Sequence, residues 1–246
     1  MARLARLCVP GLPHLVLQRS VHAQPLVHDD ADRRALHEAL QAAARAQQLA
    51  VWGWAVEPQA LWLLVCPPAA ESLGRAMQML GRRYVAGFNR RHGRQGALWG
   101  GRYRAAVVEP GEWVLTALCM IEQGSSADGA GADPARSRWS SAAHHLGTAT
   151  DALLTDPPEW WALGNTPFER EHAWRARLQA GPDPARAAAL TRAVQGAWVA
   201  GSAAFAAQVE AMAGRRARGS AMGRAQPGLR RAASFSRQHG GLAAAL

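Results

Sequence analysis

Two short apolar segments separated by three turn residues constrain the fold of this chain most. Residues 50–56 (AVWGWAV) and 60–66 (ALWLLVC) have the composition of strands, and Glu57-Pro58-Gln59 lies between them. Together they predict a β-hairpin. A helix is expected on each side of it. One starts at Asp29 and Asp30, which can cap its N-terminus, and runs to about residue 48, and the other covers residues 71–91.

A strand is expected before the first helix and another after the second. Residues 13–21 (PHLVLQRSV) and 98–109 (LWGGRYRAAVVE) have this character, and a third helix is expected over residues 112–123. The order β-α-β-β-α-β-α is that of the ferredoxin-like, split βαβ plan. We therefore expect an α+β protein in which an antiparallel sheet carries its helices on one face.

The rest of the chain is expected to be helical and then basic. Residues 1–147 hold the sheet domain, and a loop rich in Gly, Ser, Ala and Asp is expected over 124–137. Residues 148–213 form a helical C-terminal region, with helices over 167–179, 184–199 and 202–213. Residues 214–246 contain seven arginines and no acid, which predicts a flexible Arg-rich tail.

Charge points to a polyanionic partner. The 246 residues carry 28 basic and 18 acidic side chains, a net charge of +10, and every basic one is arginine. A GC-rich coding sequence would explain arginine in place of lysine, but not the excess of base over acid. Neutralising phosphates with such a surplus releases counterions. Nucleic acid is therefore the expected partner.

The cysteines and apolar segments indicate a cytoplasmic protein. Cys8, Cys66 and Cys119 are odd in number and far apart, which favours neither a disulfide framework nor a cysteine zinc site. The N-terminus lacks the apolar core of a signal peptide. No uninterrupted apolar stretch approaches the length of a membrane span, so no membrane association is expected.

Several segments together resemble the REP-associated tyrosine transposases, which are insertion-sequence-200-like, single-tyrosine HUH enzymes. Residues 14–19 (HLVLQR) resemble the first-strand pattern of this family, and residues 88–103 (FNRRHGRQGALWGGRY) resemble its helix exit and following strand. Residues 139–142 (WSSA) resemble a segment beyond the catalytic helix, and residues 201–205 (GSAAF) are a weaker match. The similarity covers about residues 3–147 well and 148–215 loosely.

The resemblance implies single-strand DNA cleavage and joining in DNA transposition. In that family two histidines, separated by one residue on a central strand, hold Mg²⁺ or Mn²⁺ together with a polar side chain from a nearby helix. A tyrosine on the same helix attacks the scissile phosphate and forms a covalent phosphotyrosine.

The family's chemistry positions are all changed in this sequence. Ala60 and Trp62 stand where the two metal-binding histidines are expected, Met120 stands at the nucleophilic tyrosine, and Gly124 stands at the third ligand. None of these side chains can bind a hard divalent cation or form a phosphodiester. We therefore expect a catalytically inactive DNA-binding relative without a metal cofactor, in which Trp62 fills space once open for metal and phosphate.

The DNA-binding candidates lie on the first strand and around the second helix exit. Residues 72–108 contain eight arginines and no acid, which is either a solvated helix face or a phosphate-binding ridge beside an indole. His14 and Gln18 share one face of their strand and Arg19 lies on the other; His14 could equally be a core residue. The candidates are His14, Gln18, Arg19, Arg90, Arg91, Arg94, Trp99, Arg102 and Arg104.

Other interpretations of the chain remain open. A working enzyme would need a non-standard nucleophile, and a protein-interaction scaffold would need no nucleic acid. His144 and His145 form a tempting metal pair, but adjacent helical residues diverge by about 100°, so they are expected to be surface residues. The expected ligand is single-stranded or hairpin DNA, bound by a monomer or homodimer.

Overall fold

A computed structural model describes residues 6–124 and 139–217. A central sheet of five strands runs in the order β2-β3-β1-β4-β5. β1 pairs antiparallel with both β3 and β4, and β2 pairs antiparallel with β3. The strands are β1 (His14–Arg19), β2 (Ala50–Glu57), β3 (Ala60–Cys66), β4 (Arg104–Val108) and β5 (Val199–Ala200).

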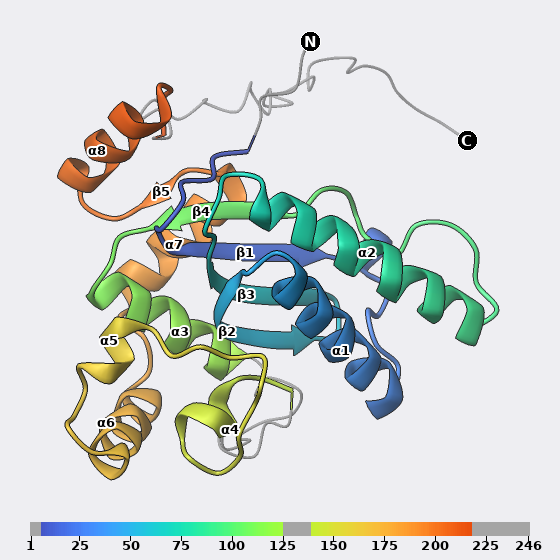
Figure 1. Cartoon of the computed structure of the whole chain (residues 1–246), viewed down its shortest axis with the longest axis horizontal. Coiled ribbons are helices and arrows are strands. Elements are labelled where there is room, and N and C mark those ends of the chain that lie inside the picture. The colour runs from blue at the N-terminus through green and yellow to red at the C-terminus, as the bar shows by residue number, and fades with distance from the viewer. Residues whose placement is uncertain (1–5, 125–138, 218–246) are drawn as a thin grey trace, which may run out of the picture.

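Two long helices cover one face of the sheet (Figure 1). They are α1 (Asp30–Ala46) and α2 (Ser72–Arg91). The Asp29 side chain accepts a hydrogen bond from the Asp32 backbone N–H and caps α1, as its sequence predicts. Val16 of β1 and Leu63 of β3 point to this side and belong to the same buried cluster as Leu36 and Leu80 of the two helices. We call this cluster the first core.

The opposite face of the sheet is also covered, which corrects the expectation of helices on one face. α3 (Glu112–Gly124) and α7 (Pro184–Gly196) pack there. Leu15 and Leu64 of the sheet join Leu118 of α3 and Leu190 of α7 in a second core. The physical reason lies in the strands: most of their residues are buried without polar alternation, as happens when both faces of a sheet are covered.

The sheet is mixed rather than wholly antiparallel, because β5 lies parallel to β4 at one edge. Sequence pattern did not indicate this two-residue strand, which follows Ala197 in a left-handed conformation (φ 57°). The expected C-terminal helices are present. α6 (Pro167–Ala180) and α7 precede β5, and α8 (Ala203–Ala213) follows it.

The remaining described helices are short. They are η1 (Val21–Ala23), α4 (Ala142–His145) and α5 (Pro158–Trp161). α3 contacts both α5 and α6 on its outer side. Trp174 and Leu178 of α6 are buried in the second core beside residues of α3, so this helical region shares the core of the sheet.

The strand expected over residues 98–109 is shorter than predicted. Only Arg104–Val108 pairs as β4, because the chain turns across the end of β1 before it. The Gly100 N–H donates to the Arg19 carbonyl over 2.9 Å, and Gly101 has a φ of +126°. A Cβ on Gly100 would lie 2.5 Å from the Ser20 carbonyl oxygen, so only glycine allows this approach.

Two expected features fall outside the described residues: most of the loop over 124–137 and the basic tail beyond residue 217. The three cysteines are unpaired. Within residues 6–124 and 139–217, no helix combines the length and apolar character needed to cross a membrane.

Candidate nucleic-acid interface

The end of β1 brings several predicted residues together on the face that α3 and α7 cover. Arg19 pairs across the sheet with Ala60, and Leu17 pairs with Trp62 on one side and Arg104 on the other. Residues directly opposite each other in adjacent strands present their side chains on the same face. Arg19, Ala60, Trp62 and Arg104 therefore share one surface, as alternation along the strands requires.

An arginine-lined hollow of about 460 Å³ lies beside this end of β1. No acidic residue is among those that line it. We call it the arginine hollow; its lining is Leu17, Gln18, Arg19, Ser20, Gly100, Arg102, Arg104 and Gln195. Guanidinium groups gathered without a carboxylate form a site of positive potential, which suits a phosphate group.

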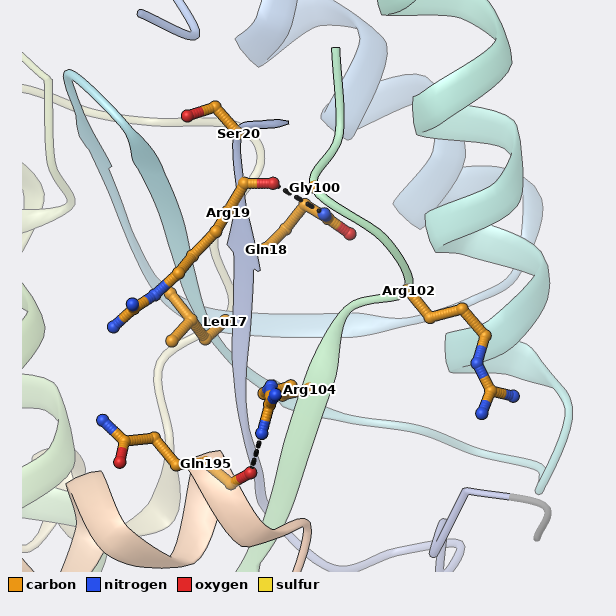
Figure 2. Close-up of a pocket in the computed structure, with 8 residues that line it drawn as sticks. All are labelled: Leu17, Gln18, Arg19, Ser20, Gly100, Arg102, Arg104 and Gln195. Carbon is orange, nitrogen blue, oxygen red and sulfur yellow. Dashed lines mark hydrogen bonds between the residues drawn. The ribbon is translucent and has the colours of Figure 1, made fainter. Parts of the chain in front are cut away.

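Arg19 extends to the left of β1, Arg104 lies between β1 and β4 beside Gln195, and Arg102 extends to the right, away from both (Figure 2). Arg104 donates a hydrogen bond to the Gln195 carbonyl at the C-terminal end of α7. This contact satisfies a terminal helix carbonyl and holds the Arg104 guanidinium at the rim while leaving other N–H donors free. Arg19 is exposed and has no ion pair within the described residues.

A second hollow of about 390 Å³ adjoins the first, and the two share Leu17, Arg19 and Ser20. We call it the tryptophan hollow because half-buried Trp62 is its one aromatic lining residue. It contains one carboxylate, Glu57, which the arginine hollow lacks. Its full lining is Leu17, Arg19, Ser20, Ala23, Glu57, Gln59, Ala60 and Trp62.

The four positions that carry the family's chemistry lie at different distances from this second hollow, and only two of them line it. Ala60 and Trp62 line it directly. Gly124 is near it, since a Cβ there would lie 2.9 Å from Glu57 Oε1. Met120 is one turn earlier on α3, with its Sδ 3.9 Å from Thr191 Oγ1 of α7, and it does not line the hollow. Trp62 is half-buried, and an open space of about 390 Å³ remains beside it.

These side chains do not fit the family's metal. Ala60, Trp62 and Gly124 offer no oxygen or imidazole ligand. Within residues 6–124 and 139–217, no group of three or more His, Cys, Asp or Glu is placed to hold a metal ion.

Both tyrosines of the chain lie across the sheet from Met120. Tyr84 and Tyr103 are buried in the first core, whereas Met120 packs against the second core on the other face of the sheet. The Tyr84 hydroxyl donates to the Leu26 carbonyl over 2.5 Å. Burial raises the pKa of both phenols, so the reactive phenolate is disfavoured at either position.

Two of the predicted DNA-binding residues are structural. His14 is fully buried, with Nδ1 2.8 Å from the Leu12 carbonyl and Nε2 accepting from the Val9 N–H at 3.2 Å. Burial lowers its pKa to about 4. Gln18 is buried and donates from Nε2 to the Gly101 carbonyl over 3.2 Å. Gln18 thus positions the loop that carries Arg102, and neither side chain is offered to solvent.

The arginines expected to form a ridge at the exit of α2 have two different environments. Arg91 is held by an ion-pair clamp to Asp29 and Asp32, whereas Arg90 is exposed. Arg91 forms ion pairs with Asp29 and Asp32, and His92 Nε2 lies 2.8 Å from Asp32 Oδ2. The hydrogen bonds that Arg91 donates to the carboxylates of Asp29 and Asp32 raise the pKa of Arg91. These contacts join the start of α1 to the end of α2. Arg90, by contrast, is exposed and unpaired within the described residues.

Arg94 and Trp99 complete this region. The Arg94 guanidinium donates to Gln24 Oε1 and lies 5.5 Å from the centroid of the Phe88 ring. Trp99 is half-buried against the first core, 6.1 Å from the Tyr84 ring. Both side chains therefore brace the exit of α2.

Sequence reasoning missed a buried polar network behind α3. Fully buried Glu122 accepts hydrogen bonds from Ser141 Oγ (2.6 Å), His145 Nδ1 (2.6 Å) and Trp174 Nε1 (2.8 Å). This corrects the expectation that His145 is a surface residue. His144, which is half-buried, contacts Asp156 at 3.2 Å. The pairing of an interior glutamate with a later histidine has no short-range sequence signal.

Ser20 was also missed. It is 8% exposed, it lines both hollows, and its hydroxyl has no hydrogen-bond partner among the described residues. A buried hydroxyl without a partner is costly unless a ligand or water satisfies it. Its only sequence signal is that it follows Arg19 at the end of a strand.

No family model and no curated protein matches the chain. Among solved structures, a REP-associated tyrosine transposase bound to a REP hairpin aligns with a TM-score of 0.51 and 10% identity, over 65% of this chain and 93% of that one. The chain shares the fold of that transposase. A candidate transposase from Deinococcus radiodurans R1 aligns with a TM-score of 0.33 and 23% identity, over 44% of this chain and 88% of that one.

Proposed function

We propose that this protein binds hairpin or single-stranded DNA and does not carry out the metal- and tyrosine-dependent chemistry of the transposases it resembles. The observation that carries the proposal is the arginine hollow, whose lining includes Arg19 and Arg104 from neighbouring strands and no acidic residue. The shared fold with a transposase that binds a REP hairpin supports DNA as the ligand.

Phosphate binding is the chemistry these groups suit best. A guanidinium presents a planar fork of donors to phosphate oxygens. Arg104 is oriented by its bond to the Gln195 carbonyl, so less side-chain entropy is lost when it meets a ligand. Exposed Arg102 is the third arginine of the arginine hollow, and Arg90 is exposed on α2.

The four changed positions support the absence of the family's chemistry. Ala60 and Trp62 stand in the hollow where a metal would need ligands, and Met120 carries a thioether with no proton to lose. The two tyrosines lie in the first core. We propose further that the protein is cytoplasmic and acts as a monomer or homodimer.

Binding of hairpin DNA across a salt series tests the proposal. The logarithm of the binding constant should fall linearly with the logarithm of salt concentration, with a slope set by the number of phosphates neutralised. Arg19→Ala and Arg104→Ala should each weaken binding and reduce the slope by about one. Arg175→Ala, an exposed arginine on α6 outside both hollows, is the matched control and should change neither.

Failure to bind any DNA at low salt would reject the proposed function. A cleavage assay tests its second half. Labelled single strands are incubated with the protein and Mg²⁺ or Mn²⁺, and the products are separated under denaturing conditions. No covalent protein–DNA adduct is expected, and a divalent-dependent adduct would show that a non-standard nucleophile is at work.

A further inference from the structure

We propose that the tryptophan hollow is a pocket for one unpaired nucleobase of the bound DNA, with Trp62 as its stacking surface and Ser20 and Gln59 as hydrogen-bonding groups. This inference rests on the proposed function, because the pocket would be filled by DNA whose phosphates lie at the adjoining arginine hollow. It assigns a ligand to the place where the residues of a metal site are missing.

The chemistry of the two hollows distinguishes what each would hold. The arginine hollow is lined by three arginines and no acid, whereas the tryptophan hollow has Arg19 on one side and the carboxylate of Glu57 on another. A carboxylate repels phosphate at close range. An uncharged base with amino and imino donors suits a lining that combines a carboxylate, an amide and a hydroxyl.

The aromatic side chain supplies the main apolar surface. Trp62 is half-buried, packed against the second core, and lines the hollow. Its neighbours Ala60 and Leu17 are apolar and do not compete for polar groups on a ligand. Bases stack on aromatic rings without regard to sequence, because every base has a π-face. The volume of about 390 Å³ is at the small end of ligand pockets.

Ser20 is the independent sign that a ligand belongs here. The residue is more than nine-tenths buried and lines both hollows, and its buried hydroxyl has no partner within the described residues. Its backbone is held rigidly, since its N–H donates to the Gln59 carbonyl over 3.0 Å and its carbonyl packs against Gly100. A base entering the tryptophan hollow would bring the ring nitrogens or exocyclic groups that satisfy this hydroxyl.

The two hollows share Arg19, so one nucleotide could use both. A nucleotide joins a flat neutral base to a charged phosphate. On one side of Arg19 the tryptophan hollow would hold the base, and on the other the arginine hollow would hold the phosphate. A paired base could not enter, because its Watson–Crick edge and both faces are occupied in a duplex. The pocket therefore predicts preference for DNA with an unpaired base.

The test compares hairpins that carry 2-aminopurine, an ordinary base or an abasic site at each unpaired position in turn. With the wild-type protein, one position should show quenched 2-aminopurine fluorescence, and an abasic site there should weaken binding about tenfold to hundredfold. Trp62→Ala should abolish the quenching and weaken binding of the unpaired ligand by a similar factor. Affinity for a fully paired blunt duplex should remain within about twofold.

Two further variants separate stacking from folding. Trp62→Phe keeps a ring and should restore most of the preference for the unpaired base, and Ser20→Ala should weaken that preference while leaving the salt slope unchanged. Trp161→Ala removes an exposed tryptophan on α5, outside both hollows, and should have no effect.

Two results would overturn the pocket. One is an abasic site tolerated at every unpaired position by the wild-type protein, and the other is equal loss of paired and unpaired binding in Trp62→Ala. Both leave salt-dependent DNA binding in place, so they are distinct from failure of the proposed function, which is loss of all DNA binding. A ribose hairpin that binds tighter than its deoxyribose counterpart would reject DNA as the ligand of both hollows.

Discussion

The Glu122 carboxylate accepts a hydrogen bond from His145 Nδ1 over 2.6 Å, and both side chains are fully buried. Ser141 and Trp174 also donate hydrogen bonds to the same carboxylate. Glu122 lies only two residues after Met120, does not line the tryptophan hollow, and joins α3 to α4 and α6. The glutamate of this helix therefore has a structural role that does not depend on chemistry at position 120.

Replacing Glu122 should destabilise the fold more than it affects DNA binding. Glu122→Ala leaves three buried donors without an acceptor, and breaking a buried, hydrogen-bonded charge typically costs about 3–5 kcal/mol. Glu122→Gln keeps one acceptor oxygen and should cost less. Urea denaturation followed by tryptophan fluorescence measures the free energy of unfolding. Equal stability of wild type and Glu122→Ala would contradict the structural role.

His14 should make stability depend on pH. Burial lowers its pKa to about 4 in the folded state, against about 6.5 in the unfolded chain. Between these values the unfolded state binds more protons, so the free energy of unfolding should fall as pH is lowered from 7 to 4, by up to about 3 kcal/mol from this group.

Comparison with His14→Asn isolates that contribution, since asparagine can still donate to the Leu12 carbonyl but does not titrate. Denaturation at pH 7.5 and at pH 5 should show a smaller difference in the variant than in the wild type. An identical difference in both proteins would assign the pH dependence to other groups. His144, whose pKa is raised by its hydrogen bond to Asp156, contributes in the opposite direction.

Gly100 and Gly87 form a matched pair of glycines. A Cβ on Gly100 would lie 2.5 Å from the Ser20 carbonyl oxygen, whereas a Cβ on Gly87 of α2 would meet nothing within 4 Å. Gly100→Ala should destabilise the fold by about 1–3 kcal/mol, because backbone must move. Gly87→Ala should stabilise it by about 0.5–1 kcal/mol through helix propensity and unfolded-state entropy. Thermal denaturation of both variants checks the two signs.

Arg91 and Arg19 should respond oppositely to the same substitution. Arg91→Gln removes the clamp to Asp29 and Asp32, so the melting temperature should fall while the salt dependence of DNA binding stays unchanged. Arg19→Gln should leave the melting temperature close to the wild type and reduce the salt slope by about one. A reduced slope in Arg91→Gln would return that residue to the DNA-binding surface.

Local sequence predicted the elements well because their signals are local. Asp29 caps the helix that it was expected to start, and α6 begins at Pro167, where the helix over 167–179 was expected. The hairpin over residues 50–66 followed from its turn residues, whereas the pairing of Arg19 with Ala60 is visible only in the structure. The changed positions at 60, 62, 120 and 124 were equally visible in the sequence, since the identity of a residue needs no coordinates.

Only the tertiary structure decided which of the candidate residues can meet a ligand. Three candidates have the sequence pattern of a binding site but form hydrogen bonds within the protein. His14 contacts the Leu12 carbonyl, Gln18 the Gly101 carbonyl, and Arg91 the aspartates at the start of α1. The covering of both sheet faces and the unsatisfied hydroxyl of Ser20 arise from contacts between segments distant in the chain. The hydrogen-bond partners and the burial of a side chain are set by such long-range packing, which a short segment of sequence does not encode.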